Sequence, residues 1–186
     1  VNIGLVLFNS PGATYPISPE LAGELVKIAN VCGMKQADLN PNTTISLLQS
    51  VGDTINVSVA DETVWFHNMT QLGHRWLLTY TPHMYQVSGC LPIKEYTDFV
   101  FAGEVSNAAK VSASLGEIRK LNAKWIMDPW RKGNMPLSAM KTWMELIGMA
   151  GGPVRPLVVE LSDPKKESLR ADLERVGLLQ KAKAGV

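Results

Sequence analysis

The sequence predicts an α/β fold built on a parallel sheet, and three observations support this class. Four short strand-like runs lie within the first 80 residues, and helical segments separate them. The connections are only a few residues long, which is typical of consecutive βα units. The first run, residues 3–8, is apolar throughout, as expected for a strand covered on both faces. Four βα units make half of a TIM (β/α)8 barrel, so we expect a half-barrel.

Local signals define each element of this half-barrel. We expect strands at residues 3–8, 31–34, 55–59 and 76–80. The first helix opens at Ser18, a good N-cap, with Pro19 in its first turn. Further helices are expected over residues 42–51 and 63–72, and Gly73 ends the second of them. Right-handed crossovers then place all the strand C-termini at one edge of the sheet.

The rest of the chain is mostly helical. We expect helices over residues 94–103, 104–127, 137–149 and 162–177, with a loop at 128–136 and an extended piece at 155–161. The pair Gly151-Gly152 ends a helix and is not expected to bind phosphate, because no Lys-Ser/Thr pattern accompanies it. We therefore divide the chain into half-barrel βα units at residues 1–92 and, at 93–186, the last barrel helix with a C-terminal helical extension.

Composition narrows the range of partners. The 186 residues carry 18 basic and 17 acidic side chains, a net charge of +1, which favours neither nucleic acid nor an anionic membrane. No apolar run reaches the roughly 18 residues that span a membrane. Two cysteines, Cys32 and Cys90, favour a reducing compartment such as the cytoplasm. Neither they nor the three histidines have metal-ligand spacing, so no metal or cofactor is expected.

The start of the chain suggests that part of the fold is missing. Val1 replaces the usual Met, and a buried-type strand begins at once, without a preceding cap or turn. Four parallel strands alone would also leave two open apolar edges. We therefore expect an N-terminal half to be absent, cleaved off or carried on another chain.

Polar residues at strand C-termini are the candidates for chemistry, because these positions face the active site of a βα barrel. They are Phe8-Asn9, Lys35, Asp61-Glu62 and Thr79-Tyr80-Thr81. Burial at a strand end disfavours a charged lysine, and a neutral amine is the nucleophile that attacks a ketone. The alternative is that Lys35 simply extends to solvent. Position alone does not decide between the two.

Two motifs favour the interpretation that Lys35 is a nucleophile. They are Phe8-Asn9-Ser10-Pro11-Gly12-Ala13-Thr14 and, one helix later, Val31-Cys32-Gly33-Met34-Lys35-Gln36-Ala37. Together they resemble the second signature of the dihydrodipicolinate synthase / N-acetylneuraminate lyase family, and the later segments 136–141 and 151–157 resemble its helical extension. The resemblance covers nearly the whole chain and aligns it with the family's second half, so the half-barrel is expected to be the second one.

The resemblance implies a Schiff-base lyase that acts on a 2-oxo acid, as a pyruvate-type aldolase, hydratase-aldolase or dehydratase. Lys35 would form the imine, and the protonated imine would draw electrons from the bond that breaks. Six residues are expected to bind substrate: Phe8, Asn9, Thr14, Asp61, Leu78 and Tyr80. Pro11 would help to shape the pocket. The family also implies a homo-oligomer, commonly a tetramer.

Two positions depart from the family's pattern. Phe8 stands where the family has a tyrosine that relays protons, and a phenyl ring has no proton to give. Water, the substrate, Tyr15, Tyr80 or the missing half would then do this work. Ala13 stands where dihydrodipicolinate synthases have an arginine that binds a carboxylate, so that particular activity is not expected. The branch that acts on sugar acids or aromatic ylidene-pyruvates fits better.

Other functional candidates have simpler alternatives. Asp61 and Glu62 match the acidic pair that N-acetylneuraminate lyases use to bind substrate hydroxyl groups. The alternative, which we favour, is that one of them caps the helix that begins at residue 63. His67 is expected at the surface or in packing, His74 in an exposed turn, and His83 as a possible acid or base. The tryptophans of the extension are expected in packing or at an interface, namely Trp125, Trp130 and Trp143. The rival to an enzyme is a non-catalytic paralogue or barrel fragment.

Overall fold

The computed structural model describes residues 3–10, 15–38 and 40–180. The chain divides into two compact units, residues 1–79 and 80–186. The first unit is α/β and the second is helical.

The first unit contains a parallel three-stranded sheet in the order β1-β2-β3. The strands are β1 (Leu5–Asn9), β2 (Val31–Gln36) and β3 (Asn56–Val59). The helices are α1 (Pro19–Leu25), α2 (Pro41–Val51), the 3₁₀ turn η1 (Glu62–Val64) and α3 (Trp65–Leu72). The α/β class, the first three strands and the first three helices are confirmed.

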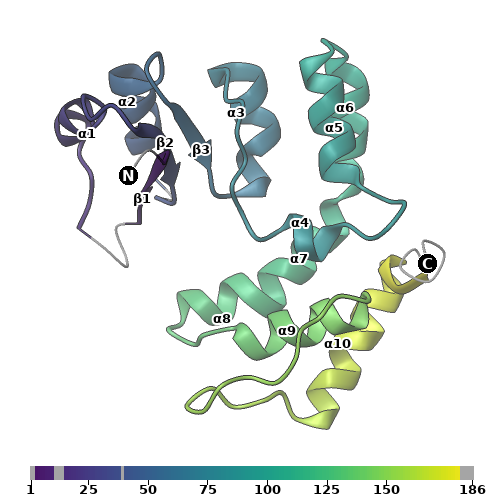
Figure 1. The fold of residues 1–186 in the computed structure, drawn as a ribbon. Coiled ribbons are helices and arrows are strands. Elements are labelled where there is room, and N and C mark those ends of the chain that lie inside the picture. The colour runs from purple at the N-terminus through teal and green to yellow at the C-terminus, as the bar shows by residue number, and fades with distance from the viewer. Residues whose placement is uncertain (1–2, 11–14, 39, 181–186) are drawn as a thin grey trace. The chain divides into compact units, whose positions relative to one another are not determined.

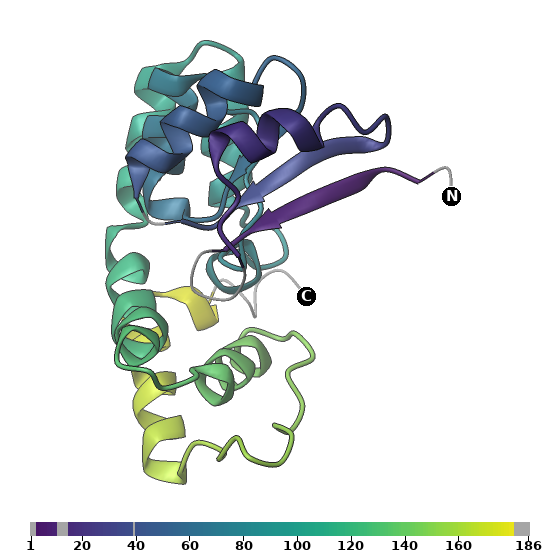
Figure 2. The same ribbon diagram turned by 90° about the vertical axis from the view of Figure 1, so that its left-hand side faces the viewer.

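Helices α1 and α2 lie along one face of the sheet (Figures 1 and 2). Their apolar residues pack against β2 and β3 in a cluster of fully or nearly fully buried side chains: Ala22, Met34, Leu47, Val51, Ile55 and Val57. Met34 and Val57 are paired in register, so they mark the face of the sheet that the helices cover. Burial of these side chains, at about 1.5–3 kcal/mol each, holds the strands in place.

Helices α1 and α2 of the first unit each begin at a capping side chain, and the first of these, Ser18, was predicted. Ser18 Oγ accepts a hydrogen bond from Leu21 N at 3.2 Å, with Pro19 in the first turn. Asn40 Oδ1 caps α2 by accepting from Asn42 N at 3.0 Å. These local contacts start each helix within a few residues of a strand end, which keeps the connections short.

Two predictions about the strands are wrong. The run at 3–8 is not buried on both faces, because Leu5, Val6 and Phe8 are 44, 49 and 48% exposed. As an edge strand, β1 pairs only with β2, and no described segment covers its other side. The fourth strand, expected at 76–80, is only a single parallel bridge between Val59 and Leu77, with no described strand beyond it.

The second unit consists of helices. They are α4 (Pro82–Tyr85), α5 (Pro92–Phe101), α6 (Val105–Ser114), α7 (Gly116–Asn122), the π-helical segment η2 (Ala123–Met127), α8 (Asp128–Arg131), α9 (Leu137–Leu146) and α10 (Asp163–Arg175). Helices α5 and α6 form a hairpin that reverses at Gly103, whose φ of 80° favours glycine (Figure 1).

The helical unit differs from the prediction in two places. The stretch 104–127 is not one helix, because it breaks near Leu115 and ends as η2. The expected loop at 128–136 begins with the short helix α8, since Pro129 is tolerated in a first helical turn. Trp143 is fully buried and donates to Met84 O at 2.9 Å, which confirms it as a packing residue. Trp130, by contrast, is exposed.

Candidate active site

A row of three residues crosses the sheet on the face opposite α1 and α2. The register pairs Phe8 with Lys35 and Lys35 with Ser58. Partners in a parallel sheet point to the same face, and neighbouring strands lie about 4.8 Å apart. This row therefore brings an amine, an aromatic ring and a hydroxyl group together near the carboxyl ends of three strands.

Lys35 is half-buried and lies over the Phe8 ring, with Nζ 5.0 Å from the ring centroid. This distance is within the range at which an aromatic face attracts a cation. The amine therefore rests against the Phe8 ring, with its side chain partly exposed to solvent. Half-burial by itself does not decide between a reactive lysine and one that extends to solvent.

Ser58 was not predicted as a site residue. It is fully buried, and its Oγ has no hydrogen-bond partner among the described residues. A buried hydroxyl without a partner costs about 1–3 kcal/mol. The only sequence signal is a polar residue between two valines of β3, and the sheet register is needed to place it beside Lys35.

Trp76 and Leu78 complete this face. Leu77 bridges to Val59, so its two neighbours point to the opposite face, the one that carries Lys35. A Cβ built on Gly33 would lie only 2.9 Å from Cζ3 of Trp76, which places the indole directly against the strand two residues before Lys35. The predicted site residues Phe8 and Leu78 thus share a face with the lysine.

Asn9 lies on the helix-covered side of the sheet and is almost fully buried. Its Nδ2 donates to Gln36 Oε1 at 2.8 Å and to Ile17 O at 3.3 Å, and its Oδ1 accepts from Ile17 N at 2.9 Å. These contacts join β1, β2 and the segment before α1. The side chain thereby fixes the path of the chain on both sides of residues 11–14.

Two other predicted positions, Asp61 and Tyr80, are not part of the row. Asp61 Oδ1 accepts from Thr63 N at 2.9 Å and caps η1, as the simpler alternative predicted. Tyr80 belongs to the second unit, where its hydroxyl donates to Asn122 Oδ1 at 3.0 Å. Pro11, Ala13 and Thr14 lie outside the described residues.

The histidines correct one prediction. His74 is 2% exposed and not in an exposed turn, and its Nδ1 lies 3.1 Å from Val57 O. Burial lowers the pKa of His74, an effect that outweighs the opposing effect of the Val57 carbonyl. His67 is exposed, as expected. His83 is also exposed and belongs to the second unit.

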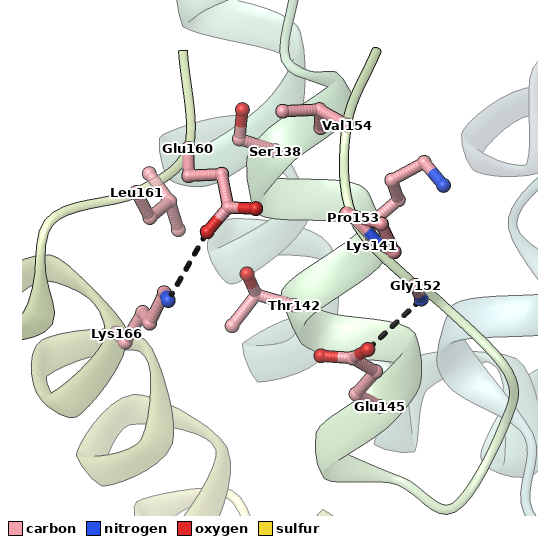
Figure 3. A pocket seen from close by; sticks show the side chains of 10 residues that line it. All are labelled: Ser138, Lys141, Thr142, Glu145, Gly152, Pro153, Val154, Glu160, Leu161 and Lys166. Atoms are coloured by element: carbon pink, nitrogen blue, oxygen red, sulfur yellow. Dashed lines mark hydrogen bonds and ion pairs between the residues drawn. The ribbon is translucent and has the colours of Figure 1, made fainter.

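A cavity of about 220 Å³ lies in the second unit, between α9 and the segment that follows it (Figure 3). The charged groups that line it contact other residues of the same chain. Glu145 accepts a hydrogen bond from Gly152 N at 2.8 Å, and Lys166 Nζ lies 3.6 Å from a carboxylate oxygen of Glu160. Lys141 donates to Gly151 O at 2.7 Å. These contacts attach the segment to α9. None of the predicted site residues lines the cavity.

Within the described ranges, no group of three or more His, Cys, Asp or Glu residues is arranged to hold a metal ion. None of the described helices is long and apolar enough to cross a membrane. The row on the sheet is therefore the arrangement whose chemistry remains to be explained.

The fold and this row define a class: an α/β protein of the βα-barrel type with an amine near the carboxyl end of a central parallel strand. Comparison with known proteins gives the family. The sequence model of the Dihydrodipicolinate synthetase family matches residues 2–176, and the chain belongs to that family.

Relatives and solved structures agree with this assignment. The chain is 25% identical to the 4-hydroxy-tetrahydrodipicolinate synthase of Desulforudis audaxviator over 179 residues, covering 96% of this chain and 56% of the relative. It is 27% identical over 184 residues to the enzyme of the same name from Thermoanaerobacter sp. strain X514, covering 98% and 57%. It thus spans little more than half the length of these relatives.

Dihydrodipicolinate synthase from Thermotoga maritima has the same fold over 96% of this chain and 57% of its own, with a TM-score of 0.74 and 20% identity. A prophage protein of the same family from E. coli K12, solved in complex with pyruvate, gives a TM-score of 0.75 at 18% identity, covering 96% and 57%. A variant of the 2-keto-3-deoxygluconate aldolase of Sulfolobus solfataricus gives 0.72 at 16%, covering 94% and 54%.

Proposed function

We propose that this chain carries the imine-forming lysine of a lyase that acts on a 2-oxo acid, and that Lys35 is that lysine. The observation that carries the proposal is the position of Lys35, half-buried near the carboxyl end of the central strand and paired with Phe8. Membership of the family supports it, as does the pyruvate complex of a protein with the same fold.

The chemistry follows from an amine in this position. A neutral amine attacks the ketone carbon of a 2-oxo acid, and loss of water leaves a protonated imine. The positive nitrogen then accepts the electron pair of a bond to the adjacent carbon, so a proton or a carbon fragment can leave. Aldol cleavage, condensation and dehydration all share this step, and the residues around the lysine select among them.

The surroundings of Lys35 favour a substrate with an apolar arm. Phe8, Leu78 and Trp76 present apolar surface on the lysine's face of the sheet. Thr14, Asp61 and Tyr80 remain proposed substrate contacts. Asn9 serves the site by holding β1, β2 and Ile17 together. Ala13 argues against dihydrodipicolinate synthase activity itself.

We also propose that the chain is the second half of a (β/α)8 barrel, with the barrel units within residues 1–92 and, at 93–186, the last barrel helix with a helical extension. The exposed apolar side chains of β1 favour a further segment that covers this edge. They also support the rival proposal, a barrel fragment inactive without its other half. Size-exclusion chromatography of the isolated chain separates an independent module from half of an enzyme. A folded monomer favours the independent module, whereas aggregation or a requirement for a partner chain favours half of an enzyme.

Deuterium exchange into pyruvate tests the proposed chemistry. An imine on the enzyme releases a methyl proton of pyruvate and recovers a deuteron from D₂O, so the methyl signal in the proton NMR spectrum fades. We expect exchange with the full-length wild-type protein and none with the full-length Lys35→Arg variant. The control is Lys27→Arg, an exposed lysine paired with Glu24 at 2.6 Å, which should exchange normally. Equal exchange in Lys35→Arg would exclude the proposal.

A further inference from the structure

Ser58 is the one polar neighbour of Lys35 in the row across the sheet that has no structural task. The register pairs the two residues on adjacent strands, and the strand spacing of about 4.8 Å is within the reach of a lysine side chain. On its other side Lys35 is paired with Phe8, which has no proton to exchange. The lysine therefore lies between an inert ring and a hydroxyl group.

The state of that hydroxyl is the second observation. Ser58 is fully buried, and within the described ranges its Oγ makes no hydrogen bond. Buried polar groups are nearly always satisfied, so each exception calls for an explanation, which can be a catalytic role. On the opposite face of the sheet, Asn9 Nδ2 donates to Gln36 Oε1 at 2.8 Å, whereas Gln36 Nε2 has no partner among the described residues. Ser58 is left free on the lysine's face.

We propose that Ser58 relays the proton when Lys35 adds to the carbonyl group of its substrate. In that step the C–N bond forms, the nitrogen gains a positive charge and the carbonyl oxygen becomes an alkoxide. The Ser58 oxygen accepts a proton from the nitrogen while its own proton passes to the alkoxide. A neutral carbinolamine results, the serine is unchanged, and no other reactant is needed. The inference rests on the proposed imine chemistry of Lys35.

The relay requires Lys35 to move between two positions. In the structure its Nζ lies over Phe8, where the ring attracts the charged amine. Rotation about the flexible four-carbon stem brings the amine to the Ser58 side, where it satisfies the buried hydroxyl. Phe8 then holds the resting amine, and Ser58 takes part when the amine reacts.

The test compares stability with the rate of imine formation for Ser58→Ala. Removing an unpartnered hydroxyl leaves no new unsatisfied group, so the unfolding midpoint should stay the same or rise. The rate at which a borohydride-trappable pyruvate adduct forms, measured by rapid quench in the protein as its gene encodes it, should fall about 10²–10⁴-fold. Ser58→Thr, which keeps the hydroxyl, should recover much of the rate.

A buried serine elsewhere provides the matched control. Ser112 is buried in the second unit and accepts from Arg119 Nη2 at 3.0 Å. Ser112→Ala should therefore lose stability and keep the wild-type rate, the reverse of Ser58→Ala. Added imidazole buffer should speed adduct formation in Ser58→Ala and leave the wild type unchanged, since small acid–base molecules replace a lost relay but not a lost structural contact.

The outcomes are distinct. Adduct formation at the wild-type rate in Ser58→Ala would overturn the relay and leave the imine chemistry standing. A slower rate that follows a loss of stability, with no rescue by imidazole or threonine, would also overturn it. Absence of any adduct in the wild-type protein would overturn the proposed function itself, and the relay with it.

Discussion

Replacing Asn9 by alanine tests how β1 is held to β2 and to the segment before α1. The change removes the 2.8 Å bond to Gln36 and both bonds to Ile17. It leaves Gln36 Oε1 without its partner in a position that is 2% exposed, and Gln36 Nε2 already lacks one among the described residues.

Each buried group left unsatisfied costs about 1–3 kcal/mol. Gln36 carries most of this penalty, and Ile17 carries less because it is only half-buried. We therefore expect Asn9→Ala to lower the free energy of unfolding by about 2–4 kcal/mol. At roughly 2–4 °C per kcal/mol for a chain of this size, the melting temperature falls by about 5–15 °C.

A double-mutant cycle isolates the amide pair. Urea unfolding, followed by circular dichroism, is compared for Asn9→Ala, Gln36→Leu and the double variant. We expect a coupling energy of about 1–2 kcal/mol, as for residues that share one hydrogen bond. Asn56→Ala, at an exposed position of β3, is the control and should cost less than about 0.5 kcal/mol. A coupling energy near zero would refute the reasoning.

Two further predictions concern the same unit. In the unfolded chain His74 is protonated below its ordinary pKa of about 6.5, whereas burial in the folded chain lowers this pKa and resists protonation. The free energy of unfolding should therefore fall as the pH drops from about 7 to 5. Thermal melts across this pH range check the prediction: His74→Gln should reduce the change of melting temperature with pH, and the control His67→Gln, at an exposed position, should not. An unchanged pH dependence in His74→Gln would count against the burial argument. Gly33→Ala forces a Cβ to 2.9 Å from the Trp76 ring and should cost about 1–3 kcal/mol in urea unfolding. The control is Gly116→Ala, whose Cβ meets nothing within 4 Å and which should be neutral or stabilising. If the two variants lost the same free energy of unfolding, the Trp76 ring would not lie against Gly33.

The features that local chemistry controls could be predicted from the sequence. Ser18 followed by Pro19 marks a helix start, and the structure has the cap there. The strand before Lys35 is recognisable because Val31 and Met34 are apolar and a helix signal follows within a few residues. Asp61 as a cap depends only on the backbone two residues later. Such contacts need no knowledge of distant segments.

The features that depend on distant partners could not be predicted in this way. The burial of β1 requires another segment beside it, and its apolar run says nothing about whether one is present. His74 was expected in an exposed turn, but it lies buried against Val57 because the bridge at Leu77 draws the chain along β3. Ser58 became a candidate only through the register, since its neighbour Lys35 is 23 positions away in the sequence (58 − 35 = 23).

The most direct test of the central claim is to locate the adduct that borohydride traps with pyruvate. After reduction, the protein is digested and the modified lysine is identified by mass spectrometry. The adduct should lie on the peptide that contains Lys35, and Lys35→Arg should abolish it. An adduct confined to surface lysines such as Lys27, or none on Lys35 when the protein is tested as its gene encodes it, would contradict the assignment.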